Sequence, residues 1–124
     1  MLGKSDQRLQ NIMILGGTDI GAKVALQLSS EKNKRVKLVE SNRERAEQLA
    51  EHLDNCLVIH GEGSDIDLLV KEGLSEMDAF VAVTADEESN LVTCLLAKHL
   101  QVKKTVALLS NGAYIPISQS IGLD

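Results

Sequence analysis

The sequence is poor in aromatic residues, with no tryptophan, one phenylalanine and one tyrosine in 124 residues. Phe80 and Tyr114 are too few to form a platform on which nucleic-acid bases stack. The net charge of −5 also opposes contact with nucleic-acid phosphates. We therefore expect no nucleic acid among the partners of this protein.

Long apolar runs and paired cysteines are also missing. No uncharged apolar run approaches the roughly 18 residues that a membrane-spanning helix needs, and the polar start at residues 4–8 does not resemble a secretory signal. Cys56 and Cys94 lack CxxC spacing, so we expect two small buried side chains, with no disulfide and no metal site. These features favour a cytoplasmic protein without direct membrane insertion.

The apolar content is sufficient for one folded domain. Apolar residues make up 44% of the chain and charged residues 25%, as in soluble globular proteins. A chain of this length buries about two-thirds of the surface that it exposes when unfolded. We expect a polar lead-in over residues 1–10 and one domain over residues 11–124, and we expect this domain to be part of a longer chain.

Five short apolar runs recur along the sequence, separated by segments with helical spacing. They cover residues 12–15, 36–39, 57–59, 79–83 and 105–109. The runs are apolar at nearly every position, which is typical of parallel strands covered by helices on both faces. The sequence therefore predicts an α/β fold, a Rossmann-like doubly wound parallel sheet in three layers with strand order 3-2-1-4-5.

Capping signals mark several of the helices between these runs. An S-x-x-E box at Ser41 and Glu44 predicts the start of the helix after the second strand. Ser64 and Asp67 form a similar box after the third strand.

Other signals mark where helices end or begin. Gly73 predicts the end of the short helix after the third strand. Residues 87–100 predict a longer helix, and Pro116 predicts the start of a last short one.

A glycine turn follows the first apolar run and is the most informative segment of the chain. It consists of Gly16, Gly17, Thr18, Asp19, Ile20 and Gly21. In a dinucleotide-binding G-x-G-x-x-G loop, the first glycine makes the turn, the second admits the pyrophosphate, and the third lets the helix pack on the strand. Gly16 and Gly21 fill the first and third positions, and Thr18 replaces the second glycine. The loop predicts a phosphate site at a helix N-terminus.

Thr18 and Asp19 leave two interpretations of this loop open. The branched side chain of Thr18 would crowd a phosphate, and the charge of Asp19 would repel it, with Lys23 partly neutralising that charge one turn later. In one interpretation the loop nevertheless binds a nucleotide. In the other, Thr18 or Asp19 caps the helix in place of the phosphate, and no cofactor binds.

An acidic residue follows the second apolar run, where such folds hold a ribose. Glu40 lies nineteen residues beyond Gly21, close to the usual separation. A carboxylate here prefers the free 2′-hydroxyl of NAD to the 2′-phosphate of NADP, a preference that Arg43 would weaken. The alternative is a solvated acid that favours the dipole of the following helix.

Three further segments extend the pattern, and with them residues 11–124 resemble the TrkA-type nucleotide-binding domain, the N-terminal half of an RCK (regulator of potassium conductance) module. Residues 60–65 (HGEGSD) resemble the G-D-[GA]-[ST]-D turn of that family. Residues 83–90 (VTADEESN) are similar to its T-x-D-D-E-x-N segment, and residues 111–114 (NGAY) to its N-x-x-Y segment. The glycine loop differs, because the family commonly has arginine where this chain has Asp19.

The resemblance implies a cofactor site in which Glu40 holds the ribose, one turn borders the adenine, and the end of the fourth strand approaches the ligand from the opposite side. No catalytic residue and no metal ligand belongs to it. The expected site comprises Gly16, Gly17, Thr18, Asp19, Ile20, Gly21, Glu40, Ser41, Gly61, Glu62, Gly63, Thr84 and Ala85.

The function implied by the resemblance is that of a cytoplasmic regulatory subunit or domain of a Trk-type potassium uptake system, peripheral to the inner face of the membrane. NAD or NADH, or alternatively ATP or ADP, would bind and gate a membrane potassium channel or transporter subunit. Another RCK domain would pair with this one, either in a homo-oligomer or within one chain. A degenerate, ligand-free RCK domain that serves dimerisation or scaffolding is the alternative.

A fragment of an NAD-dependent oxidoreductase is the enzymatic alternative, because hydride-transfer enzymes share this half-fold. Tyr114 has no lysine four residues later, and the glycine pattern is not the TGxxxGxG of short-chain dehydrogenases. The remaining length is also too short for a substrate domain. We therefore expect no enzymatic activity.

Overall fold

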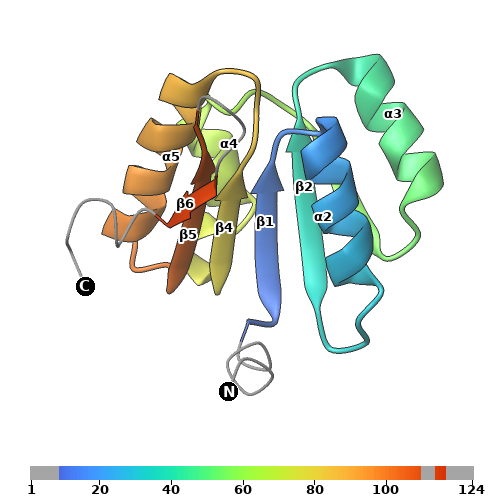
Figure 1. Cartoon of the computed structure of the whole chain (residues 1–124), viewed down its shortest axis with the longest axis horizontal. Coiled ribbons are helices and arrows are strands. Elements are labelled where there is room, and N and C mark those ends of the chain that lie inside the picture. The colour runs from blue at the N-terminus through green and yellow to red at the C-terminus, as the bar shows by residue number, and fades with distance from the viewer. Residues whose placement is uncertain (1–8, 110–113, 117–124) are drawn as a thin grey trace.

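A six-stranded sheet lies between two pairs of helices in the computed structural model, which describes residues 9–109 and the backbone of residues 114–116 (Figure 1). The strands are β1 (Asn11–Leu15), β2 (Arg35–Glu40), β3 (Cys56–His60), β4 (Ala79–Ala82), β5 (Lys104–Leu108) and β6 (Tyr114–Pro116). The helices are α2 (Asp19–Ser29), α3 (Arg43–His52), α4 (Ile66–Lys71) and α5 (Glu87–His99), and η1 (Leu74–Glu76) is a short 3₁₀ turn.

The strand order is β3-β2-β1-β4-β5-β6, with β1 to β5 parallel and β6 antiparallel to β5. The predicted fold class and the order 3-2-1-4-5 are therefore confirmed. After β1, the chain adds β2 and then β3 on one side of the sheet. It then crosses to the other side of β1, where β4 pairs with β1. This reversal leaves a crevice at the carboxyl ends of β1 and β4, which is where open α/β sheets bind ligands.

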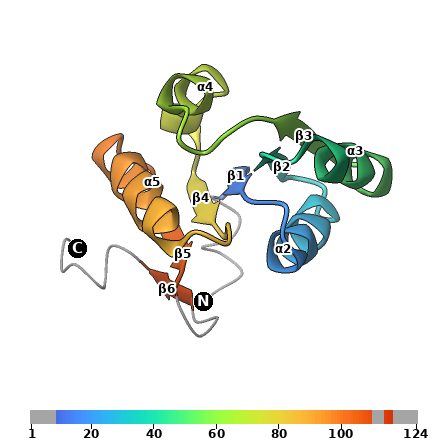
Figure 2. The same ribbon diagram turned by 90° about the horizontal axis from the view of Figure 1, so that it is seen from above.

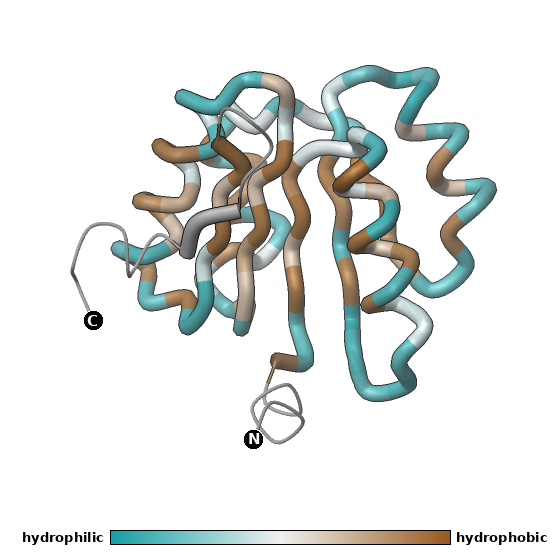
Figure 3. Tube along the Cα trace, in the orientation of Figure 1, coloured by the Kyte–Doolittle hydropathy of each residue, from teal (hydrophilic) through white to brown (hydrophobic). Residues whose placement is uncertain are grey.

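Helices cover both faces of the sheet, α2 and α3 on one face and α4 and α5 on the other (Figure 2). Met13 and Leu15 belong to the apolar cluster that includes residues of α4 and α5, whereas Ile12 and Ile14 belong to the cluster that includes residues of α2 and α3. All four side chains are at most 2% exposed. The central strands therefore have to be apolar at consecutive positions, as their colour in Figure 3 shows.

The start of α3 differs from the prediction by one residue. Its N-cap is Asn42, whose side-chain oxygen accepts a hydrogen bond from the backbone N–H of Arg45 at 2.9 Å. Glu40 provides the physical reason, because its carboxylate accepts the N–H of Asn42 at 2.8 Å and fixes the chain before the helix. The predicted capping box of Ser41 and Glu44 is wrong.

The start of α4 is shifted in the same way, whereas its end agrees with the prediction. Asp65 caps α4 by accepting the N–H of Leu68 at 3.1 Å, so the predicted box of Ser64 and Asp67 is wrong. Gly73 follows the helix with a φ of +96°, a left-handed conformation that glycine adopts readily.

The residue predicted to start the last helix lies in a strand, and the positions after it are outside the described residues. Pro116 lies in β6, opposite Val106 of β5. Within the described part of the chain, β6 forms an edge of the sheet, and a residue without an N–H group is tolerated in an edge strand. Residues 111–113 of the predicted N-x-x-Y segment lie outside the described residues.

Asp78 joins the starts of β1 and β4. One oxygen of its carboxylate accepts the N–H groups of Gln10 at 2.9 Å and Asn11 at 3.0 Å. We expect Asp78→Ala to lower the free energy of unfolding by about 1–3 kcal/mol, because two backbone donors lose a charged acceptor. Urea denaturation measures this change. Asp54→Ala, at an exposed turn, should stay within about 0.5 kcal/mol, and an equal loss in both variants would contradict the role of Asp78.

Candidate functional site

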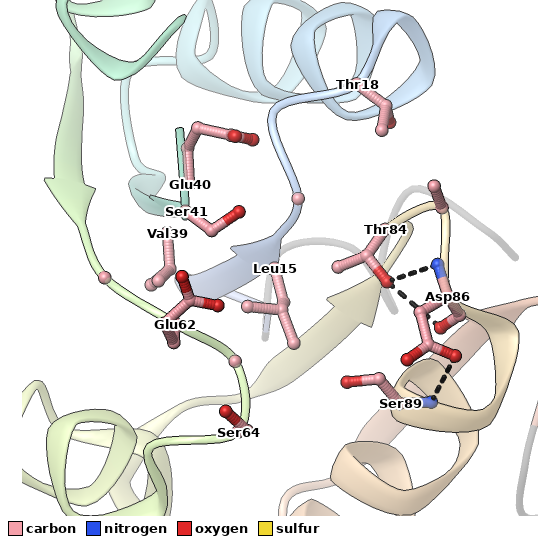
Figure 4. Close-up of a pocket in the computed structure, with 14 residues that line it drawn as sticks. Leu15, Thr18, Val39, Glu40, Ser41, Glu62, Ser64, Thr84, Asp86 and Ser89 are labelled. Atoms are coloured by element: carbon pink, nitrogen blue, oxygen red, sulfur yellow. Dashed lines mark hydrogen bonds between the residues drawn. The ribbon is translucent and has the colours of Figure 1, made fainter. Parts of the chain in front are cut away.

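A cleft of about 380 Å³ opens at the carboxyl ends of the parallel strands, a volume within the range of small-molecule sites. Figure 4 shows Glu40 and Ser41 on one side of it, Thr84 and Asp86 across from them, and Leu15 between. The cleft is lined by Leu15, Gly16, Thr18, Val39, Glu40, Ser41, Gly61, Glu62, Gly63, Ser64, Thr84, Ala85, Asp86 and Ser89.

Most of the residues expected to contact a cofactor meet at this cleft. They come from the ends of β1, β2 and β4 and from the turn after β3, segments that are far apart in the sequence. Those that line it are Gly16, Thr18, Glu40, Ser41, Gly61, Glu62, Gly63, Thr84 and Ala85. Their contact with a nucleotide remains a prediction.

The other four expected residues do not line the cleft. Gly17 is buried and donates its N–H to Glu40. Ile20 packs against the apolar cluster on the α2 and α3 face, and Gly21 is buried. Asp19 projects into solvent, with its side chain 99% exposed.

Two glycines of the loop have steric roles that the spacing predicts. Gly16 has a φ of +112°, and a β-carbon there would lie 2.8 Å from the backbone nitrogen of Thr84. A β-carbon at Gly21 would collide with the carbonyl oxygen of Gly16. Glycine at these positions therefore lets the loop approach the end of β4 and lets α2 pack closely on the turn.

Thr18 caps α2. Its hydroxyl oxygen accepts the N–H of Gly21 at 3.2 Å, and the hydroxyl donates to the carbonyl oxygen of Val83 at 2.8 Å. Of the two residues proposed as caps, Thr18 is the one that the structure bears out. The N–H groups of Asp19 and Ile20 have no acceptor among the described residues, so the helix start keeps two donors that an anion can use.

Asp19 obstructs the cleft less than its position in the sequence suggests. Its carboxylate lies 3.7 Å from a terminal nitrogen of Arg45, which also donates through Nε to the carbonyl oxygen of Gly17 at 2.8 Å. The expected partner, Lys23, is not the residue paired with it. Because water surrounds the Asp19 side chain, its repulsion of a phosphate is screened.

Glu40 is fixed by the backbone around it. One carboxylate oxygen accepts the N–H of Gly17 at 2.6 Å, and the other accepts the N–H of Asn42 at 2.8 Å. Each oxygen retains a lone pair that can accept a ribose hydroxyl. Arg43 does not line the cleft and instead pairs with Glu47 at 3.7 Å.

Five lining residues were missing from the expected site: Leu15, Val39, Ser64, Asp86 and Ser89. Leu15 is the last residue of β1, and Val39 is the residue before the last of β2. Their apolar character indicated only that they belong to the hydrophobic core. Asp86 caps α5, accepting the N–H of Glu88 at 3.1 Å. Its place after the fourth strand and before a helix was a sequence signal that could have identified it.

The described side chains that line the cleft carry negative charge and no positive charge. Glu40, Glu62 and Asp86 contribute carboxylates, and among the described residues neither lysine nor arginine lines the cleft. A phosphate in this cleft would therefore depend on backbone N–H groups and on the positive end of the α2 dipole.

The cysteines do not resemble reactive thiols. Burial raises the pKa of the Cys94 thiol to about 12 and that of Cys56 to about 11, so both stay protonated near neutral pH. Over residues 9–109 and 114–116 there is no group of three or more side chains suited to hold a metal ion. In the same part of the chain, no helix has the length and apolar composition needed to cross a bilayer.

An open parallel sheet, a glycine turn into the first helix and an acid at the end of the second strand define a Rossmann-type α/β domain. The chain belongs to the TrkA-N domain family, whose sequence pattern matches residues 12–124.

Named relatives agree with this assignment. The chain is 39% identical over 123 residues to the Trk system potassium uptake protein TrkA of Vibrio alginolyticus, covering 99% of this chain and 26% of that protein. It is 34% identical over 124 residues to a TrkA homolog of Methanosarcina mazei, covering 100% of this chain and 30% of that protein. The chain thus spans less than a third of the length of these relatives.

A solved structure supports the fold. A putative short chain dehydrogenase/reductase family oxidoreductase from Aeromonas hydrophila superposes with a TM-score of 0.57 at 21% identity, over 76% of this chain and 53% of that one. At this identity the similarity concerns the fold alone.

Close packing at Gly21, the third glycine of the loop pattern, predicts the sign of the stability change when alanine replaces it. Alanine favours a helix over glycine by about 1 kcal/mol, yet we expect Gly21→Ala to destabilise the protein by about 1–3 kcal/mol because the Gly16 carbonyl leaves no room. Urea denaturation measures the change. Lys23→Ala, on the exposed side of α2, is the control and should stay within about 0.5 kcal/mol. A more stable Gly21→Ala variant would refute the packing argument.

Proposed function

We propose that this chain is a nucleotide-binding regulatory domain of a Trk-type potassium uptake system. The observation that carries the proposal is the arrangement around Glu40, whose fixed carboxylate lies beside the glycine loop and lines a cleft at the switch point of the sheet. The names of the relatives, potassium uptake proteins of the Trk system, supply the biological context.

The charge of the cleft favours NAD or NADH over ATP and ADP. Within residues 9–109, three carboxylates line it and no lysine or arginine does, so each additional negative charge on the ligand is unfavourable. A dinucleotide carries fewer charges on its phosphates than ATP and brings a second ribose and base to the cleft. We infer the order NAD(H), then ADP, then ATP.

Regulation requires two conformations of the assembly that bind the nucleotide with different affinity. We propose that this domain lies in the cytoplasm, peripheral to the inner face of the membrane, and acts on a potassium channel or transporter subunit. Because the relatives are more than three times as long, we infer that this domain is one module of such a protein.

A ligand-free domain that serves dimerisation or scaffolding is the second candidate. Thr18 favours it, because its hydroxyl already caps α2 where a phosphate would bind. An enzymatic function has less support, since no lysine, histidine or cysteine lines the cleft in the part of the chain that the structure describes and the relatives are named for potassium uptake.

Thermal unfolding with added nucleotides separates the two candidates. A ligand at about 100 times its dissociation constant adds about 2.7 kcal/mol to the free energy of unfolding, which raises the melting temperature by several degrees. We expect NADH to raise it most, NADPH least, and ADP more than ATP, with calorimetric titration giving the affinities. No shift with any nucleotide would favour the ligand-free domain.

The ribose role is tested with Glu40→Gln, which removes the charge and one acceptor at nearly constant shape. We expect the affinity for NADH to fall by about tenfold, the equivalent of about 1.4 kcal/mol. Glu44→Gln, on the exposed start of α3, is the matched control and should bind as the unchanged protein does. Unaltered affinity in Glu40→Gln would exclude Glu40 from the ribose site.

A second RCK domain is the partner that the surface supports best. Six large apolar side chains are exposed among the described residues, and four of these, Ile66, Val70, Val92 and Leu95, lie on α4 and α5. These helices cover the same face of the sheet (Figure 2). Apolar side chains gathered on one face are typical of an interaction surface. We propose that this face pairs with another copy of the domain.

The oligomeric state tests this pairing. Val92, on α5, is 55% exposed, and Val92→Glu would place a charge in the apolar interface. We expect the dissociation constant of the dimer to rise by at least about tenfold, measured by analytical ultracentrifugation. Leu26→Glu, at a residue 58% exposed on α2 of the opposite face, should leave association unchanged. Equal weakening by both variants, or a monomer at every concentration, would refute this surface.

A further inference from the structure

Asn90 is a polar side chain in the core. It lies on the first half of α5 with a relative exposure of 0%, facing the sheet together with the apolar residues of that helix. A buried amide is costly unless all of its groups are hydrogen-bonded. Its contacts show how that cost is offset.

Three of these contacts go to Thr84, the second residue after the end of β4. The side-chain oxygen of Asn90 accepts the N–H of Thr84 at 3.0 Å and its hydroxyl at 2.6 Å. The side-chain nitrogen of Asn90 donates to the carbonyl oxygen of Thr84 at 3.0 Å. Asn90 thus forms hydrogen bonds with the backbone N–H, the backbone carbonyl oxygen and the side-chain hydroxyl of Thr84.

The fourth contact reaches another strand. The side-chain nitrogen of Asn90 donates to the carbonyl oxygen of Leu108, the last residue of β5, at 2.9 Å. We call the set of Thr84, Asn90 and Leu108 the Asn90 bridge. It links the turn after β4 to the end of β5 through one side chain.

One end of the Asn90 bridge lies in the cleft, because Thr84 is a lining residue (Figure 4). The residue before it, Val83, accepts the hydroxyl of Thr18 at 2.8 Å. The end of β4 is therefore held from both sides, by the cap of α2 and by Asn90. The other end of the bridge lies where β5 ends, before the chain reaches β6.

We propose that Asn90 is a positioning residue that couples Thr84 in the cleft wall to the end of β5, so that a change at Thr84 moves the end of β5. For a change caused by a nucleotide, the inference rests on the proposed function. Only an amide fits this role, because the bridge needs an acceptor toward the N–H and hydroxyl of Thr84 and two donors toward the carbonyl oxygens. A carboxylate would face those two oxygens without a proton to donate.

Backbone-amide NMR tests the coupling without a ligand. Thr84→Val removes the hydroxyl bonded to Asn90, and we expect the amide signal of Leu109, which follows the bonded carbonyl, to shift. When Thr84→Val is combined with Asn90→Asp, the Leu109 signal should stay where it is in Asn90→Asp alone. Glu62→Gln changes the opposite wall of the cleft without touching the bridge, and it should leave Leu109 unshifted.

Hydrogen exchange with NADH tests the same coupling with a ligand. NADH should slow exchange of the β5 amides in the unchanged protein and leave it unaltered in Asn90→Asp, whose NADH affinity should fall by roughly tenfold. Thr93→Val, at a buried residue of the same helix bonded to Ser89 at 2.7 Å, controls for loss of stability and should keep the NADH effect. If Asn90→Asp does not fold, Asn90→Ser, whose hydroxyl is too short to span the bridge, replaces it in both experiments.

The outcomes separate the coupling from the proposed function. Two results together would support the coupling and overturn the proposed function: a Leu109 shift on Thr84→Val that depends on Asn90, and no binding of NADH, ADP or ATP. NADH binding with unchanged exchange in β5, or a Leu109 signal that does not respond to Thr84→Val, would overturn the coupling.

Discussion

The carboxylate of Glu40 is the interaction on which the site depends. By accepting the N–H groups of Gly17 and Asn42, it ties the glycine loop after β1 to the start of α3 after β2. The loop is thereby held in the conformation in which Thr18 caps α2 and the N–H groups of Asp19 and Ile20 remain without acceptors in the described chain. A residue that the spacing suggests for ribose binding also organises the site before any ligand arrives.

Across the cleft, the end of β4 is held by neutral hydrogen bonds. Thr18 reaches Val83, and Asn90 holds Thr84 and reaches Leu108, so the ends of β1, β4 and β5 are joined by side chains from the starts of α2 and α5. The cleft is therefore bounded by the charged contacts of Glu40 on the β2 side, and by amide and hydroxyl contacts together with the Asp86 cap on the β4 side. A ligand that spans it would touch both.

The fold was predictable from the sequence because burial on both faces requires consecutive apolar residues in the central strands, and Ile12 to Leu15 fulfil this requirement. The glycine loop and Glu40 were predictable because their spacing follows from the length of one strand–helix–strand unit. The caps at Asn42 and Asp65 were not, since neighbouring residues of similar capping tendency compete. At α3 the choice depends on the Glu40 carboxylate, which accepts the N–H of Asn42 and is itself held by the distant Gly17. Arg45 and Asn90 act through contacts between elements, which no local pattern contains.

The most direct test of the account is a titration of the protein with NADH followed by backbone-amide NMR. We predict saturable shifts that begin at Gly17, Asp19 and Ile20, include Gly61 and Thr84, and leave the opposite end of the sheet around Asp78 unchanged. Such a pattern would mean that the loop fixed by Glu40 still receives a nucleotide beside the Thr18 cap. Spectra that do not change up to millimolar NADH, or shifts confined to residues outside the cleft, would contradict the account.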